Sequence, residues 1–284
     1  MRTSDIYAGL MVLCLIPGCG AEAPGDDELL DDEEAVLGES ESSLVYVNAL
    51  TLNALTLNSI GLNSLNQNAL TLNALNSASL NALQDPGPNG TLARAFARYA
   101  AGCALNTSQK LTFSWKDSSG VTHNESYPGE LGIFPKWASG PLDDYGQRMV
   151  SACVAARVNW YGTQVTISMR SLQDPLKTLV GSKELADYPD VEGAFWGNLW
   201  GAAPFIHACY NSATVANSRA NKRDCAVGHL NADGSISECG IIDILGPCSQ
   251  YCQGLNGAGQ YYPSCIEKPG INTSTQLVVT VALP

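Results

Sequence analysis

Glu192 and His207 are the two residues whose types could together perform acid–base chemistry in this chain. Glu192 lies in a segment, 191–200, that the sequence predicts to be a helix, with Trp196 and Trp200 one turn apart. A carboxyl group beside aromatic side chains can have a raised pKa and protonate a glycosidic oxygen. The pair is therefore the candidate catalytic site of a glycan or cell-wall hydrolase.

A structural interpretation of the same residues competes with the catalytic one. Glu192 would lie in the first turn of the predicted helix, where the helix dipole favours an acid, and the two tryptophans would pack in the core. Asp187 and Asp190 are close in sequence, but one acid without an identified partner is not a mechanism. The sequence also contains no G-x-S-x-G, H-E-x-x-H, Walker or dinucleotide-binding motif. The structural interpretation is therefore favoured.

The beginning of the chain has the layout of an export signal. Arg2 is followed by an apolar run over residues 6–17, and then by Gly18 and Cys19. A positive start, an apolar stretch and a small residue at the cleavage point are typical of a secretory leader. The run is shorter than the roughly 20 apolar residues of a transmembrane helix. Residues 1–19 are therefore predicted to direct export.

The residues Ile16-Pro17-Gly18-Cys19 resemble the lipobox of bacterial lipoproteins. In that family the cysteine is diacylated and becomes the new N-terminus, so the resemblance implies lipidation at Cys19. Two or more acyl chains anchor a protein stably, because each buried methylene contributes about 0.8 kcal/mol. The implied partner is a membrane, reached through the lipid at the outer membrane or cell surface. An ordinary secretory leader is the alternative.

The negative charge of the chain is concentrated directly after this cysteine. The formal net charge is −12, and ten of the 27 acidic residues lie within residues 20–43, which contain no Lys or Arg. This segment is predicted to be a disordered acidic tether, extended by its own repulsion. The rest of the chain is close to neutral. It has no cationic footprint, which argues against a nucleic-acid partner.

A five-residue repeat follows within residues 44–85. From Asn48 the chain reads NALTL, NALTL, NSIGL, NSLNQ and NALTL. A period of five would scatter the leucines around a helix and would move them between the two faces of a strand. A coil that turns at each Asn would instead point the leucines inward, because Asn tolerates left-handed geometry. The pattern resembles the pentapeptide-repeat family, which implies a short β-helix-like stalk or docking element.

Residues 86–284 are predicted to form one disulfide-rich α+β domain, because helices and strands are segregated along the chain. A turn-rich cluster over residues 85–90 marks its beginning, and Thr91 or Asn89 is expected to cap its first helix. Helices are expected at 91–103, 142–159 and 191–200, a hairpin at 110–115 and 121–127, and strands at 164–170 and 276–283.

The chain has 10 cysteines, too many for an ordinary cytosolic protein of this size. Cys14 lies in the leader and Cys19 is the lipidation site. An even number remains, which predicts four disulfides and no metal. Cys103 pairs with Cys153 in this prediction, because both fall on apolar helix faces, and the other pairings stay open. The remaining cysteines are Cys209, Cys225, Cys239, Cys248, Cys252 and Cys265. Zinc at Cys248-x3-Cys252 is a disfavoured alternative, since thiolate ligands need reducing conditions.

Two further patterns have both a binding and a structural interpretation. The segment 231–235 (NADGS) hints at a calcium loop, but its ligand pattern stops there, and a plain turn is favoured. The chain has 5 Trp and 11 Tyr against 5 Phe. Such side chains can form a sugar-binding platform or can pack around disulfides, and packing is favoured. The tryptophans are Trp115, Trp137, Trp160, Trp196 and Trp200. No cofactor is expected.

Three segments, 96–105 (FARYAAGCAL), 149–171 (MVSACVAARVNWYGTQVTISMRS) and 192–199 (EGAFWGNL), resemble an uncharacterised group of exported, Cys-rich lipoproteins from gliding, predatory soil bacteria. The resemblance implies an architecture and a location, but no mechanism. We therefore expect a non-enzymatic, lipid-anchored surface protein that binds an extracellular polymer or protein partner or helps to build the envelope. The hydrolase with Glu192 and His207 is the alternative.

Overall fold

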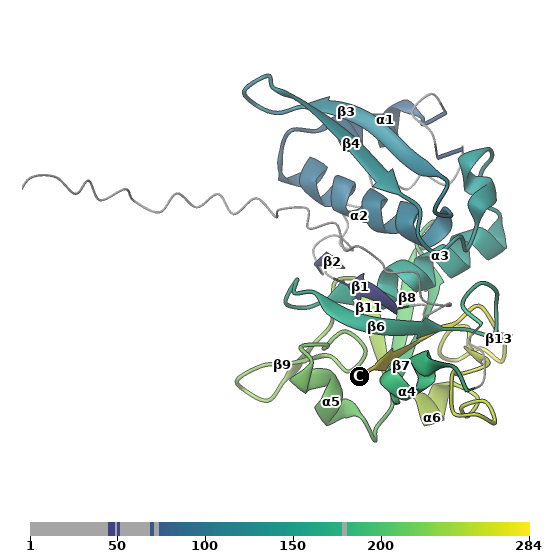
Figure 1. The fold of residues 1–284 in the computed structure, drawn as a ribbon. Helices are drawn as coiled ribbons and strands as arrows, with labels where there is room; N and C mark the ends of the chain where they lie inside the picture. The colour runs from purple at the N-terminus through teal and green to yellow at the C-terminus, as the bar shows by residue number, and fades with distance from the viewer. Residues whose placement is uncertain (1–44, 49, 52–68, 71–73, 178–180) are drawn as a thin grey trace, which may run out of the picture. The chain divides into compact units, whose positions relative to one another are not determined.

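The computed structural model describes residues 45–48, 50–51, 69–70, 74–177 and 181–284. The chain divides into two compact units, Met1–Ser40 and Glu41–Pro284, and every described residue belongs to the second. The predicted leader, Cys19 and the acidic tether lie outside the described residues. The second unit is a mixed α+β structure (Figure 1).

A six-stranded mixed sheet forms the base of this unit, with the strand order β1-β6-β14-β7-β8-β11. Neighbouring strands are antiparallel except β8 and β11, which are parallel. The strands are β1 (Val45–Asn48), β6 (Val165–Arg170), β14 (Val279–Leu283), β7 (Asp190–Asn198), β8 (Phe205–Tyr210) and β11 (Ile242–Pro247). The predicted strands at 164–170 and 276–283 are confirmed as β6 and β14.

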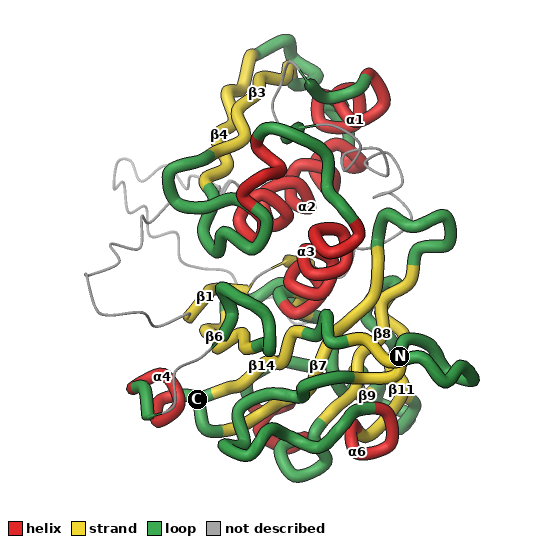
Figure 2. The backbone as a smooth tube through the Cα atoms, turned by 90° about the vertical axis from the view of Figure 1, so that its right-hand side faces the viewer, coloured by secondary structure: helices red, strands yellow, loops and turns green. Residues whose placement is uncertain are grey.

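Two helices cover one face of the sheet in successive layers, as Figure 2 shows. Helix α3 (Asp144–Ala156) packs on β7 and β14, and helix α2 (Pro88–Ala104) packs on α3. Both predicted helices are confirmed. The cap of α3 is the Asp143 side chain, which accepts a hydrogen bond from the Gly146 N–H at 2.8 Å. The predicted cap of α2 is wrong, because this helix begins at Pro88 and both proposed residues lie inside it.

A hairpin and a short helix pack on the outer side of α2. The hairpin joins β3 (Lys110–Lys116) to β4 (Thr122–Pro128), as the sequence predicts. Helix α1 (Ser77–Gln84) is capped by Asn76, whose side chain accepts a hydrogen bond from Ser79 N. This helix occupies the end of the segment predicted to coil every five residues. Most of that repeat, residues 52–68 and 71–73, lies outside the described residues.

Short elements complete the unit. Helix α6 packs on β8 and β11, at the face of the sheet opposite α3. The remaining helical segments are Pro135–Ala138 (a 3-10 turn), α4 (Lys183–Asp187), α5 (Val215–Ala220) and α6 (Cys248–Tyr251). The remaining strands pair as β2 (Leu50–Thr51) with β5 (Val158–Asn159), β9 (His229–Leu230) with β10 (Ile236–Ser237), and β12 (Cys265–Ile266) with β13 (Ser274–Thr275).

The helix predicted over residues 191–200 is wrong, because residues 191–198 belong to the central strand β7 and a turn follows. Both of its faces are buried, so the polar and apolar alternation that identifies a half-exposed strand is missing. Gly193 allows β8 to approach closely, since a Cβ atom there would lie 2.1 Å from the Cys209 carbonyl oxygen. The spacing of Trp196 and Trp200, which suggests a helical turn, instead reflects burial on two sides.

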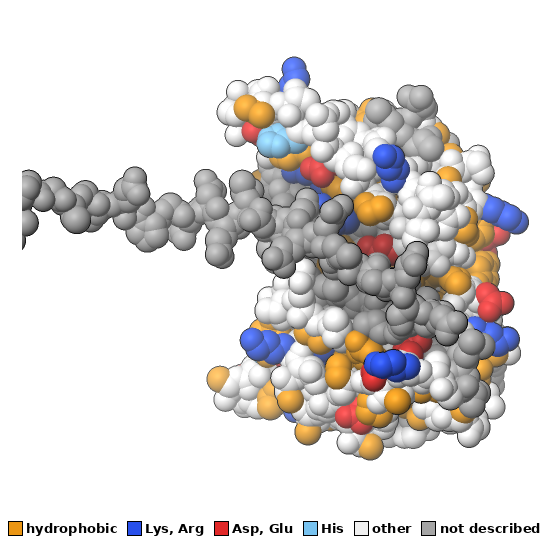
Figure 3. Space-filling model, in the orientation of Figure 1, with side chains coloured by type: hydrophobic (Ala, Val, Ile, Leu, Met, Phe, Trp, Pro, Cys, Tyr) orange, Lys and Arg blue, Asp and Glu red, His pale blue; other side chains and the backbone are white. Residues whose placement is uncertain are grey.

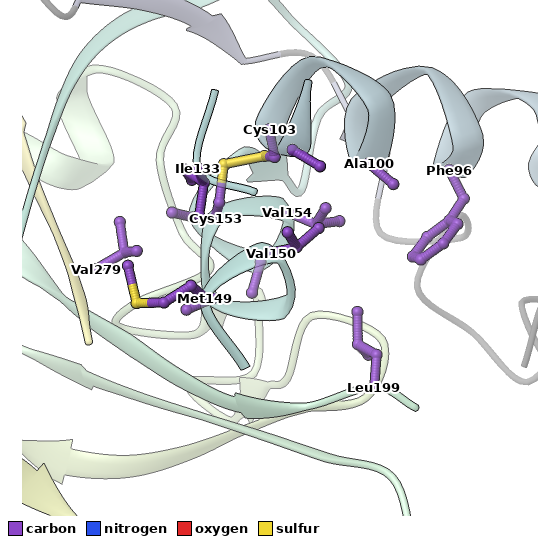
Figure 4. Close-up of a cluster of buried hydrophobic side chains, with 14 of the residues drawn as sticks. Phe96, Ala100, Cys103, Ile133, Met149, Val150, Cys153, Val154, Leu199 and Val279 are labelled. Atoms are coloured by element: carbon purple, nitrogen blue, oxygen red, sulfur yellow. A yellow bond between two sulfur atoms is a disulfide. The ribbon is translucent and has the colours of Figure 1, made fainter. Parts of the chain in front are cut away.

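Four disulfides brace the unit. Cys103 of α2 is bonded to Cys153 of α3, which confirms the predicted pair, and Figure 4 shows the bond between the two helices among Ile133, Val150 and Val154. The structure also resolves the pairings that the sequence leaves open. They are Cys209–Cys248, Cys225–Cys239 and Cys252–Cys265.

Candidate functional site

All three histidines of the chain lie beside an aspartate and a tryptophan, yet the sequence places these residues far apart in two of the three cases. An aspartate that fixes one ring nitrogen of a histidine leaves the other nitrogen for a ligand or a proton. The three clusters differ in the burial of the histidine and the aspartate. They are His123 with Asp117 and Trp115, His207 with Asp243 and Trp196, and His229 with Asp224 and Trp160.

The His123 cluster stabilises the β3–β4 hairpin. Asp117 accepts hydrogen bonds from the backbone N–H groups of Ser119 and Val121, both at 2.9 Å. His123 Nε2 lies 2.8 Å from the same carboxylate. This contact, together with the hydrogen bonds of the turn, holds the pKa of Asp117 below its ordinary value. The role of the His123 cluster is therefore to stabilise the turn of the hairpin.

The His207 cluster is a row across three neighbouring strands. Trp196 of β7, His207 of β8 and Asp243 of β11 are Cα partners in register. His207 Nδ1 lies 3.1 Å from Asp243, but the imidazole is the buried member and the carboxylate the exposed one, with side-chain exposures of 8% and 53%. Burial lowers the pKa of His207, and Asp243 opposes that change. The ring is therefore enclosed by the fold.

The His229 cluster has the opposite arrangement, with a buried acid and an accessible base. The side chain of Asp224 is 4% exposed and that of His229 is 21% exposed. Asp224 Oδ2 lies 2.7 Å from His229 Nδ1 and accepts a 3.1 Å hydrogen bond from the Tyr161 hydroxyl. The Trp160 ring stacks on the imidazole with centroids 4.2 Å apart and planes at 6°. Because the carboxylate accepts, Nδ1 carries the proton and Nε2 points away from Asp224.

A buried arginine brings the two halves of this cluster together. Arg223 donates to the carbonyl oxygens of Ala156 (3.0 Å) and Val158 (2.7 Å), which lie just before the Trp160–Tyr161 pair. Arg223 is fully buried, so these bonds fix the backbone of the next residue, Asp224, beside the Tyr161 hydroxyl. On the other side, the Asn159 side chain accepts from the Tyr161 N–H at 2.8 Å.

A disulfide-closed loop carries the histidine. The bond between Cys225 and Cys239 begins directly after Asp224 and encloses β9, which contains His229. The loop turns back through the 231–235 segment, where Asp233 accepts from both the N–H and the hydroxyl of Ser235. The turn predicted for this segment is confirmed.

Glu192 is the other partner of Arg223, and this contact changes the interpretation of the predicted catalytic pair. Arg223 Nε and Nη2 donate to Glu192 Oε2 at 3.2 and 2.8 Å, and both side chains are inaccessible to solvent. Burial raises the pKa of the Glu192 carboxyl, and the guanidinium opposes that rise. Glu192 therefore lies in an internal ion pair, with no exposed surface for a substrate.

Glu192 and His207 also point to opposite faces of the sheet. Ile206 and Ala208 belong to the core on the α3 side, so His207 between them points to the other side. Glu192 meets Arg223 at the end of α3. The structure thus does not bring the two candidate catalytic residues into one site. Nearby, Asp190 accepts from Asn217 at 2.7 Å, and Asp187 forms an ion pair with Lys183.

The tryptophans divide between packing and the surface. Trp137, Trp196 and Trp200 are buried, and the ring of Trp200 meets those of Trp137 and Phe96 edge-on. The predicted packing role is confirmed for these residues. Trp115 and Trp160 are only half-buried, and they are the two that stack on histidines.

Exposed apolar side chains gather around the His229 cluster. Tyr161, Leu230 and Ile236 are 47%, 46% and 50% exposed, and they are three of the five large hydrophobic side chains exposed in the described part of the chain. Leu230 and Ile236 face each other across the β9–β10 hairpin, which lies at the lower left of Figure 3. Exposed apolar side chains grouped beside polar ones are typical of an interaction surface.

Sequence inspection missed this cluster because it depends on contacts between distant segments. Tyr161 and Asp224 are 63 residues apart, and Tyr161 and His229 are 68 apart. The adjacent Trp160 and Tyr161 form a local signal for an aromatic surface, but nothing local links them to Asp224. We name Trp160, Tyr161, Asp224 and His229 the aromatic–histidine site.

No protein-family model, curated protein or solved structure matches this chain. Within the described residues, no helix is both long and apolar enough to span a membrane.

Proposed function

We propose that this protein is a lipid-anchored surface protein of the cell envelope whose disulfide-braced domain binds a hydroxyl-rich polymer, such as an extracellular or cell-wall glycan. The lipobox-like residues around Cys19 support the anchor. The aromatic–histidine site supports the binding activity. One observation carries this part of the proposal. Buried Asp224 holds both the Tyr161 hydroxyl and the His229 imidazole at a partly exposed aromatic surface.

The chemistry of the site suits a saccharide better than a charged ligand. The ring of Tyr161 offers an apolar face for the C–H side of a sugar. Nδ1 of His229 is committed to Asp224, and Nε2 makes no hydrogen bond in the part of the chain that the structure describes, so Nε2 can accept one from a hydroxyl group. Within the described residues, no hydrogen bond joins His229 to a serine, threonine or cysteine side chain. An oriented base without a bonded nucleophile favours binding over covalent catalysis.

We predict that loss of the Tyr161 ring weakens binding to glycans by about two- to tenfold, since an aromatic contact contributes about 0.5–1.5 kcal/mol. The full chain would be co-sedimented with peptidoglycan sacculi, chitin and an insoluble β-glucan. Tyr161→Ala and His229→Gln should both reduce the bound fraction, whereas Tyr161→Phe should keep the ring contact and lose less.

The matched control is His123→Gln. It removes the other accessible histidine that stacks on a tryptophan, but in the hairpin rather than in the site. This variant should bind like the wild type. The binding proposal is overturned if the wild type sediments with none of the polymers, or if His229→Gln and His123→Gln behave alike.

The anchor is tested separately by metabolic labelling with palmitate. Wild-type chain should carry the label and fractionate with membranes, and Cys19→Ala should lose the label completely. Cys14→Ala is the control, because it removes the neighbouring leader cysteine without touching the predicted acylation site. A Cys19→Ala chain that still labels would contradict lipidation at this residue, whatever the glycan experiment gives.

A further inference from the structure

Two disulfides lie in contact at the face of the sheet opposite α3. Cys209 of β8 is bonded to Cys248 at the start of α6, and Cys252, just after α6, is bonded to Cys265 of β12. The Sγ atoms of Cys209 and Cys252, which belong to different disulfides, are only 3.5 Å apart. The Sγ atoms of Cys209, Cys248 and Cys252 all lie within 4.8 Å of one another.

We propose that these four cysteines form a thiol–disulfide exchange site, in which Cys252 receives electrons from an external dithiol and passes them to the Cys209–Cys248 bond. A thiolate must reach a disulfide sulfur to exchange with it, so both access and proximity decide whether the reaction occurs. Cys252 is the partly exposed residue of the cluster, and its Sγ atom lies close to a sulfur of the other disulfide.

Access is restricted to one member of the cluster. Cys209, Cys248 and Cys265 are at most 1% exposed, whereas Cys252 is half-buried. The other two disulfides of the unit, Cys103–Cys153 and Cys225–Cys239, join residues that are all fully buried. An external thiolate would therefore meet Cys252 before any other disulfide sulfur of the described residues.

The first step reduces the Cys252–Cys265 bond. One thiolate of the dithiol attacks Cys252 Sγ, and the S–S bond breaks with its electron pair on Cys265, which leaves as a thiolate and takes a proton from water. The second thiolate of the dithiol then closes its own disulfide and expels Cys252 as a thiolate. The dithiol is oxidised by two electrons, and the cysteine pair is reduced by two.

The second step moves the reduction inward without changing the electron count. The Cys252 thiolate attacks Cys209 Sγ across the 3.5 Å contact, a Cys209–Cys252 bond forms, and Cys248 leaves with the electron pair of the broken bond. The old and new bonds span 39 and 43 residues, so their loop-closure costs are nearly equal. The two free thiols now belong to Cys248 and Cys265, which are buried, and a buried free cysteine packs as a small apolar side chain.

Limited reduction of the full chain tests this proposal. One equivalent of dithiothreitol would be added to the native protein, the thiols would be trapped with N-ethylmaleimide after an acid quench, and the label sites and remaining disulfides would be mapped by mass spectrometry. We expect the singly reduced protein to carry labels on Cys248 and Cys265 and a disulfide between Cys209 and Cys252. Labels on Cys252 and Cys265 with an intact Cys209–Cys248 bond would overturn the relay.

A pair of variants provides the matched comparison. Cys265→Ser breaks a disulfide that spans 13 residues and leaves Cys252 unpaired beside a second disulfide. Cys239→Ser breaks one that spans 14 residues and leaves Cys225 unpaired. In Cys265→Ser, Cys248 should become alkylated in part of the population. In Cys239→Ser, the thiol label should stay on Cys225. If both variants carry the label only on the cysteine left unpaired, the contact between the Sγ atoms of Cys209 and Cys252 does not support exchange, and the proposal is overturned. If Cys265→Ser does not fold, the wild-type experiment still decides.

Discussion

Replacing Arg223 with methionine is expected to reduce the free energy of unfolding by about 3–5 kcal/mol, because it leaves the Glu192 carboxyl buried without its counter-charge. Neither side chain is accessible to solvent, so water cannot take the place of the guanidinium. The substitution also removes the donors to Ala156 and Val158, which connect the segment after α5 to the end of α3 and to β5. Denaturant unfolding of the full chain would measure the loss.

The loss should depend on pH in a defined direction. Burial already raises the pKa of Glu192 in the folded protein above its value in the unfolded chain. A raised acid pKa means that the folded state holds its proton longer, so stability falls as pH rises from the unfolded to the folded pKa. Without Arg223 the folded pKa rises further. The variant should therefore lose less stability, relative to wild type, near pH 5 than near pH 8.

Two further variants separate this effect from a general one. Lys222→Met removes the adjacent but exposed cation and should change stability by less than about 0.5 kcal/mol. Adding Glu192→Gln to Arg223→Met removes the uncompensated charge and should restore part of the loss, chiefly at the higher pH. A loss in the free energy of unfolding that is the same at pH 5 and pH 8, or no larger than that of Lys222→Met, would show that the Glu192–Arg223 ion pair does not stabilise the fold.

The parts of the fold that the sequence predicts are those in which polar and apolar residues alternate with a clear period. The hairpin β3–β4 has a turn and exposed positions, helix α3 begins with polar residues before its buried part, and strand β6 alternates apolar residues with Ser168 and Arg170, which are buried but hydrogen-bonded. The Cys103–Cys153 bond also follows from two amphipathic helices whose cysteines lie on their apolar faces. In such elements the hydrophobic pattern carries the information, and local reasoning is sufficient.

The central strand and the site escape local reasoning for different reasons. Strand β7 is buried on both faces, so its residues show no period, and two tryptophans four residues apart look helical. The aromatic–histidine site is assembled by Arg223, which reaches from the segment after α5 to the end of α3 and to β5. An arginine with buried carbonyl partners looks like any surface cation in a sequence. Its role depends on burial, which only the folded chain defines.

The disulfide between α2 and α3 is expected to contribute more to stability than the one that closes the His229 loop. The Cys103–Cys153 bond spans 50 residues and the Cys225–Cys239 bond spans 14. In the chain-entropy model a cross-link stabilises by restricting the unfolded chain, and loops of these lengths correspond to about 4 and about 3 kcal/mol. Cys103→Ala with Cys153→Ala should therefore lower the free energy of unfolding more than Cys225→Ala with Cys239→Ala.

The two double variants are well matched, because all four cysteines are fully buried and alanine adds no polar group to either position. Figure 4 shows that the first bond lies among Ile133, Val150 and Val154, whose packing stays available to hold α2 on α3. Denaturant midpoints and slopes would be compared under non-reducing conditions, since a changed slope would report a changed unfolded state. If loss of the 14-residue bond lowers the free energy of unfolding more, this bond stabilises the folded loop around His229 rather than restricting the unfolded chain. The chain-entropy argument then fails for this protein.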